Sequence, residues 1–166
     1  MYIRRYLIVS YIVSLIFSIS LLYYDECLSL FILDREEELL VLDIPRIKLR
    51  RKVYNIGSKN NNVDYNIEIL NNSNIENNLY FIASHSGSSR ASYFDDLVYL
   101  SVGDLISLKS NDSIIVFVVK DMYYIDKNGY FNVSYNINGR ELFLITCSLN
   151  YINRQLIVRA ELIYKC

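Results

Sequence analysis

Hydrophobic and polar positions divide the chain into one long apolar run near its start and a series of short apolar segments after it. From residue 6 to residue 24 no side chain is charged, and a helix of about 20 apolar residues can cross the hydrocarbon core of a membrane. Arg4 and Arg5 precede this run, while Asp25 and Glu26 follow it. Because basic residues favour the cytoplasmic side, the pattern predicts a membrane anchor with the rest of the chain outside.

The same run has a second interpretation, a cleaved secretory signal peptide with small residues near Ser18 and Ser20 as the cleavage site. We favour an uncleaved single-pass helix, because the run is long for a signal-peptide core and its far end is aromatic and acidic. The expected organisation is a cytoplasmic tip and transmembrane helix over 1–24, a stalk over 25–38 and an extracellular domain over 39–166.

Beyond residue 39 the apolar segments are short and rich in β-branched and aromatic residues, which is typical of strands. Asn-Gly pairs at 128–129 and 138–139 are turn signals of the hairpin kind, and the Asn-rich stretches 55–62 and 71–78 indicate loops. No repeated helix separates the strands, so the pattern predicts an all-β sandwich or closed barrel with short helical turns. The expected strands are 40–44, 48–54, 79–83, 105–108, 114–124, 141–147 and 155–163.

Composition narrows the classes of function. The 166 residues carry a formal net charge of −1, which gives no sign of a nucleic-acid partner. One histidine and three scattered cysteines supply too few ligands for a metal site, so we expect no metal and no cofactor. An odd number of cysteines outside the cell leaves at least one thiol unpaired or bonded to another chain, and Cys147 is a candidate for a free thiol.

The histidine and one cysteine both stand at the ends of strands of the buried type. His85 follows the strand 79–83, and Cys147 ends the strand 141–147. A thiolate that attacks and an imidazole that handles the proton of the leaving group form the minimal set for thiol-based acyl transfer. Arg154 opens the next strand in phase with its apolar face, and a guanidinium there can stabilise an oxyanion. Each residue alone also has an ordinary structural explanation, as a small buried thiol, a satisfied histidine and an arginine that reaches solvent.

Five short motifs resemble those of the sortase family and follow in the family's order. They are the Ile-Pro-x-Ile that opens the barrel, the strand that delivers the histidine, an aromatic-x-x-Leu turn, a Gly-Asp-x-Ile strand start and the Thr-Leu-x-Thr-Cys signature. These motifs lie at residues 42–47, 81–87, 93–97, 102–106 and 143–147. Phe143 stands where the signature usually has Thr, and Ser84 stands where Gly commonly precedes the histidine. The resemblance covers residues 39–166 and implies a closed sortase-like β-barrel.

The resemblance also implies an activity, cysteine transpeptidation at an LPxTG-like sorting signal. Cys147 attacks the Thr carbonyl and forms a thioester, His85 protonates the departing amine, and Arg154 holds the oxyanion or the substrate backbone. Thr146 and Ser84 line the substrate groove. An amine of a cell-wall precursor or of another protein then resolves the thioester, which attaches proteins to the wall of a Gram-positive-type cell.

Two other functions stay open on the sequence. An extracytoplasmic cysteine hydrolase would use the same pair of residues with water as the acceptor. A non-catalytic, membrane-tethered β-barrel that binds a wall polymer or peptide would carry an unreactive Cys147. An L,D-transpeptidase is excluded, because its motif needs a cysteine two residues after the histidine and Gly87 stands there.

Overall fold

The computed structural model describes residues 13–21, 23–24, 38–128, 133–135 and 140–166. The chain divides into two compact units, residues 1–37 and residues 38–166. In the first unit residues 13–21 are helical with exposed side chains, and the Ser18 hydroxyl donates to the Ser14 carbonyl at 3.0 Å. Within the described residues no helix has both the length and the apolar character needed to cross a membrane. Of the predicted span over 6–24, residues 6–12 and 22 lie outside the described residues, as does the stalk over 25–37. Glu38, predicted as the end of the stalk, is the first residue of a strand.

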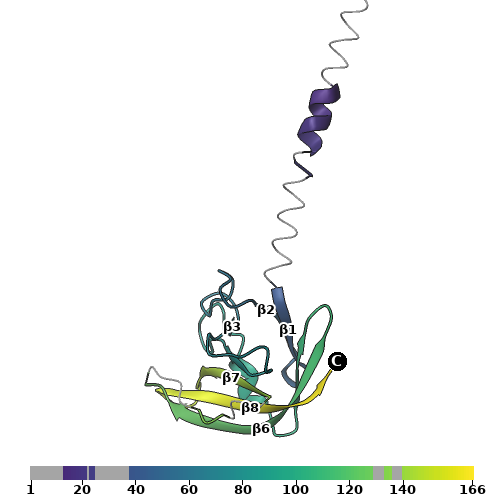
Figure 1. Cartoon of the computed structure of the whole chain (residues 1–166). Coiled ribbons are helices and arrows are strands. Elements are labelled where there is room, and N and C mark those ends of the chain that lie inside the picture. Colours follow the sequence, from purple (N-terminus) through teal and green to yellow (C-terminus); the bar gives the residue numbers. More distant parts are fainter. Residues whose placement is uncertain (1–12, 22, 25–37, 129–132, 136–139) are drawn as a thin grey trace, which may run out of the picture. The chain divides into compact units, whose positions relative to one another are not determined.

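The second unit is an eight-stranded sheet with the strand order β2-β1-β5-β6-β8-β7-β4-β3 (Figure 1). Two 3-10 helices, η1 and η2, follow β1 and β4. An isolated bridge between Val53 and Ile67 brings β2 beside β3, so the sheet is nearly closed into a barrel. The elements are β1 (Glu38–Ile44), η1 (Pro45–Ile47), β2 (Leu49–Tyr54), β3 (Glu68–Ile69), β4 (Tyr80–Ala83), η2 (Asp95–Tyr99), β5 (Leu105–Lys109), β6 (Ile114–Asp126), β7 (Glu141–Cys147) and β8 (Arg154–Lys165).

This architecture confirms the predicted β-barrel with short helical turns, as a sheet that is nearly closed. One strand is not predicted, and the bounds of most of the others differ by one or two residues. The strand β3 is not predicted by the sequence, because two residues are too few to show an alternation of apolar and polar positions. The strands β6 and β8 end two residues later than the pattern predicts, since each continues along the other in one long antiparallel ladder.

One ladder among the named strands is parallel, and it determines where the functional residues meet. β4 runs parallel to β7 with Phe81 opposite Phe143, whereas the other named strands pair in antiparallel fashion. Parallel strands finish at the same edge of a sheet. The residues that follow β4 are therefore brought to the C-terminal end of β7.

The central strands bury both of their faces. Successive side chains of a strand point to opposite faces, so Leu142 and Leu144 enter the barrel core while Phe143 and Ile145 pack on the other side. We call this second group the outer cluster. Its buried members are Leu79, Phe81, Phe143, Ile145 and Ile157, and Leu70, Ala83, Tyr123, Ile125 and Val133 pack against them.

Candidate active site

The ends of β4 and β7 bring the only histidine beside a cysteine. The parallel register ends with Ala83 opposite Ile145, and beyond it the Ser86 hydroxyl donates to the Cys147 carbonyl at 2.5 Å. The same offset continued by two residues puts His85 opposite Cys147. Two residues that are 62 positions apart in the chain thus become neighbours across one pair of strands, as Ser84 and Thr146 do just before them.

Alternation along β7 assigns Cys147 to the outer face of the barrel. Cys147 stands two residues after Ile145, which packs in the outer cluster, and residues two positions apart share a face of a strand. At the end of the strand Cys147 also lines a small pocket with Ser86, Ser148 and the core residues Phe94 and Leu156. The candidate site therefore lies where the outer face meets the end of the barrel.

Cys147 is a free, half-buried thiol with a cation beside it. The Lys127 ammonium lies 3.3 Å from the Cys147 sulfur, and the Lys127 N–H donates to the Asn153 carbonyl at 2.8 Å. The ammonium donates a hydrogen bond to the sulfur and places a positive charge beside the atom that would attack a carbonyl carbon. Sequence reasoning missed Lys127, because it belongs to no motif and reaches Cys147 only through the pairing of β6, β8 and β7.

The His85 ring is partly exposed, and a carboxylate faces it. Nε2 lies 3.4 Å from Asp64 Oδ1, and 35% of the histidine side chain is exposed. Among the described residues the ring contacts Asp64 and not Cys147. The loop after His85 is held by Gly87, whose φ of +95° suits glycine and whose N–H donates to Asp95 at 2.7 Å. This hydrogen bond fixes the loop directly after His85.

Arg154 lies at the rim of the site as the first residue of β8. Its carbonyl accepts a hydrogen bond from the Ser148 N–H at 2.8 Å, which ties the start of β8 to the residue after Cys147. The guanidinium is half-exposed, with Nε 3.5 Å from Asp126 Oδ1 and its centre 5.8 Å from the Tyr151 ring. Because Asp126 is itself 81% exposed, this surface ion pair is weak and a substrate oxygen can replace it.

Thr146 and Ser84 are buried, and their hydroxyls serve the fold. The Thr146 hydroxyl donates to the Ser84 carbonyl at 2.9 Å, and the Ser84 hydroxyl donates to the Ala91 carbonyl at 3.0 Å. These bonds fix β4 against β7 directly below the two candidate catalytic residues. Direct contact of either side chain with a substrate stays a prediction.

The family model described as Sortase domain matches residues 42–163 of the chain. None of the curated proteins compared matches the sequence. A solved structure of sortase C from Streptococcus pneumoniae is 23% identical, covers 78% of this chain and 71% of its own, and superposes with a TM-score of 0.66. Sortase A from Listeria monocytogenes is 17% identical over 78% of this chain and 89% of its own, with a TM-score of 0.64.

A third similar structure is a sortase D5 transpeptidase from Clostridium perfringens. It is 20% identical, covers 76% of this chain and 79% of its own, and has a TM-score of 0.63. At these identities the structural likeness concerns the fold.

Proposed function

The chain belongs to the sortase family of cysteine transpeptidases, and we propose that it cleaves an LPxTG-like sorting signal and transfers the acyl group to an amine. The single observation that carries this proposal is the parallel pairing of β4 with β7, which supports a site where His85, after β4, and Cys147, at the end of β7, share one edge of the sheet. A free thiol and an imidazole at one edge suit acyl transfer through a thioester.

The proposed mechanism assigns one task to each residue. The Cys147 thiolate, with the Lys127 ammonium beside it, attacks the Thr carbonyl of the signal and forms a tetrahedral intermediate. His85 donates a proton to the departing amine, the C–N bond breaks and a thioester remains. The Arg154 guanidinium leaves Asp126 and donates to the oxyanion while it exists. An acceptor amine then attacks the thioester carbonyl, His85 takes the proton that this amine loses, the C–S bond breaks and the thiolate departs.

We place this reaction at the outer surface of a cell membrane. The uncharged run over 6–24, with basic residues before it and acidic residues after it, supports a single-pass anchor with the catalytic domain outside. On that side the acceptor is the amine of a cell-wall precursor or of another protein, and the product is a protein attached to the wall. The reaction needs only side chains of the chain itself and no cofactor.

The test uses the full chain in detergent, incubated with a panel of LPxTG-like peptides and followed by mass spectrometry. Wild type is compared with Cys147→Ala, each with and without oligoglycine as the amine. We expect an acyl adduct on Cys147 and a product whose amount depends on the amine. A hydrolase would release the same acid with or without the amine.

A thiol-reactive probe supplies the control for a negative result. Cys166 is an exposed free thiol outside the site, so its labelling measures the reagent. Absence of any peptide adduct, together with labelling of Cys166 but not of Cys147, would refute the catalytic role and favour a binding module.

A further inference from the structure

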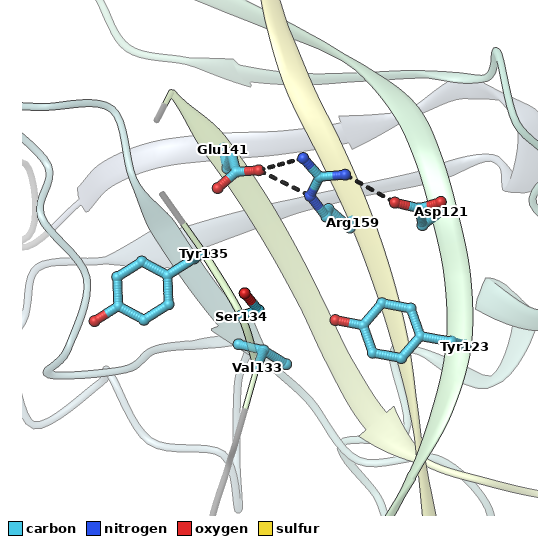
Figure 2. Close-up of a pocket in the computed structure, with 7 residues that line it drawn as sticks. All are labelled: Asp121, Tyr123, Val133, Ser134, Tyr135, Glu141 and Arg159. Carbon is cyan, nitrogen blue, oxygen red and sulfur yellow. Dashed lines mark hydrogen bonds and ion pairs between the residues drawn. The ribbon is translucent and has the colours of Figure 1, made fainter. Parts of the chain in front are cut away.

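A cavity of about 600 Å³ opens on the outer face of the sheet, away from the catalytic edge (Figure 2). Strands β6, β7 and β8 supply its floor, and residues 133–135 close one side. None of the residues proposed for catalysis lines it. The lining residues are Asp121, Tyr123, Val133, Ser134, Tyr135, Glu141 and Arg159.

The charges around this cavity leave an excess of negative charge. Arg159 lies 2.8 Å from Asp121 and 2.6 Å from the buried carboxylate of Glu141. It also lies 2.8 Å from Glu161, which Lys120 approaches at 3.7 Å. The hydrogen bond to Asp121, followed by that to Glu141, raises the pKa of Arg159 above its ordinary value, so it stays charged. Its donors already point at carboxylates, which leaves the cavity suited to a cation rather than an anion.

The walls suit the long stem of a basic side chain. Asp121 is 54% exposed and offers its carboxylate to the cavity, and the Tyr123 hydroxyl points toward the middle of the lining residues (Figure 2). The Tyr135 ring packs edge-on against Phe81 of the outer cluster, with centroids 5.3 Å apart. Aromatic rings accommodate the methylene groups and attract the charge of lysine or arginine.

The register of the strands gives the distance from the cavity to the nucleophile. Asp121 pairs with Arg159, and Arg159 pairs with Phe143 on β7. These three residues form one row of paired residues across the sheet, and the row that contains the candidate nucleophile is the pair of Gln155 with Cys147. The two rows are separated by about 13 Å along β7, since a strand rises about 3.3 Å per residue. Asp121 also lies two strands from β7, which adds about 10 Å across the sheet at a strand spacing of about 4.8 Å. The diagonal distance is therefore about 16 Å, which four residues of an extended substrate and the stem of one long side chain cover.

The position of His85 gives the direction in which the substrate lies across the sheet. His85 follows β4, on one side of Cys147, whereas β8 and β6 lie on the other side of β7. The leaving amine has to face His85, so the acyl part of the substrate runs the opposite way, over β8 and β6. The residue about four positions before the attacked Thr therefore reaches the cavity, and this is the residue directly before the Leu of an LPxTG-like core.

We propose that the cavity binds a lysine or arginine side chain of the protein substrate, at the position directly N-terminal to the LPxTG-like core. This inference rests on the proposed function and adds a specificity to it. Because the cavity lies away from the reacting bond, a charge contact there strengthens the binding of the substrate and of the acylation transition state alike, and so raises kcat/KM.

The test compares three peptides that share the core preferred by the enzyme and carry Lys, Ala or Glu directly before it. For the wild-type full chain we expect a kcat/KM at least about fivefold higher for the Lys peptide than for the Ala peptide, and lowest for the Glu peptide. Asp121→Asn is expected to abolish the difference. Glu161→Gln is the matched control, because it also removes a carboxylate from Arg159 but does not line the cavity, and it should keep the preference.

Equal kcat/KM values for the three peptides in an enzyme that forms the thioester would overturn the inference and leave the proposed function intact. Binding to Cys147→Ala, measured by fluorescence anisotropy of labelled peptides, tests the cavity without acyl transfer. We expect tighter binding of the Lys peptide, and its loss when Asp121→Asn is added. Equal affinities would overturn the inference even if no peptide is cleaved.

Discussion

The lysine beside the candidate nucleophile leads to a prediction about the reactivity of Cys147, and its magnitude follows from the distance between the lysine ammonium and the sulfur. Lys127→Met removes the ammonium that lies 3.3 Å from the Cys147 sulfur and keeps a long, unbranched side chain. The ammonium and a unit negative charge on the attacking sulfur interact at that separation by about 1.3 kcal/mol in bulk water, which corresponds to about a ninefold change in the rate of attack. Lys127 is exposed, and ordering a long side chain costs entropy, so we expect a change of about threefold to tenfold.

Alkylation by iodoacetamide measures the reactivity of the sulfur directly. Mass spectrometry follows Cys147, and the exposed Cys166 serves as the internal reference. We expect alkylation of Cys147 in Lys127→Met to be slower by the stated factor at pH 7 in low salt, and the difference from wild type to shrink in about 1 M salt, which screens the charge contact.

Lys120→Met is the control for this experiment, since Lys120 lies on β6 and pairs with Glu161 at 3.7 Å. It should alkylate at the wild-type rate throughout. Equal rates for Lys127→Met and wild type at pH 7 would refute the electrostatic argument. A deficit that persists unchanged in about 1 M salt would show that Lys127 acts on access to the thiol instead.

Three further substitutions test the fold around the site. Glu141→Gln should lower the free energy of unfolding in urea by about 1–3 kcal/mol, because the buried carboxylate that faces Arg159 loses its charge; an unchanged value would contradict the assigned pairing. Burial raises the pKa of Tyr80 above its ordinary value, so the folded state keeps the phenolic proton after the unfolded state has lost it, and stability falls as pH rises above about 10. Tyr80→Phe should reduce that alkaline fall in urea unfolding measured from pH 8 upward, and an equally steep fall would count against the burial argument. Ser86→Ala removes the hydrogen bond to the Cys147 carbonyl; we expect a loss of about 1 kcal/mol in stability and a severalfold slower formation of the thioester, whereas a wild-type acylation rate would separate Ser86 from the positioning of Cys147.

The barrel could be predicted from the sequence because its strands are short, β-branched and separated by turn signals. Register was harder, since β7 is buried at six successive positions. A continuous apolar run such as this one does not tell which residues enter the core and which pack outside. The outer cluster, and with it the cavity over Arg159, therefore came only from the strand pairing.

The residues of the candidate site also divide into those that the sequence predicts and those that only the structure shows. His85, Cys147 and Arg154 could be found from the sequence because each stands at the end of a strand inside a short motif. Asp64 and Lys127 could not, since their contacts with His85 and Cys147 depend on how loops and strand ends far apart in the chain come together. The local sequence around them is ordinary and polar.

The parallel ladder between β4 and β7 also has a consequence for the order of folding. It joins segments that are 62 residues apart at Ser84 and Thr146, and such non-local pairing forms slowly because a long loop must first be closed. In the sheet β7 lies between β4 and β8, and β8 is the last of these strands to be synthesised. A nascent or truncated chain consequently carries its thiol without an imidazole nearby, and acyl-transfer chemistry begins only when the barrel is complete.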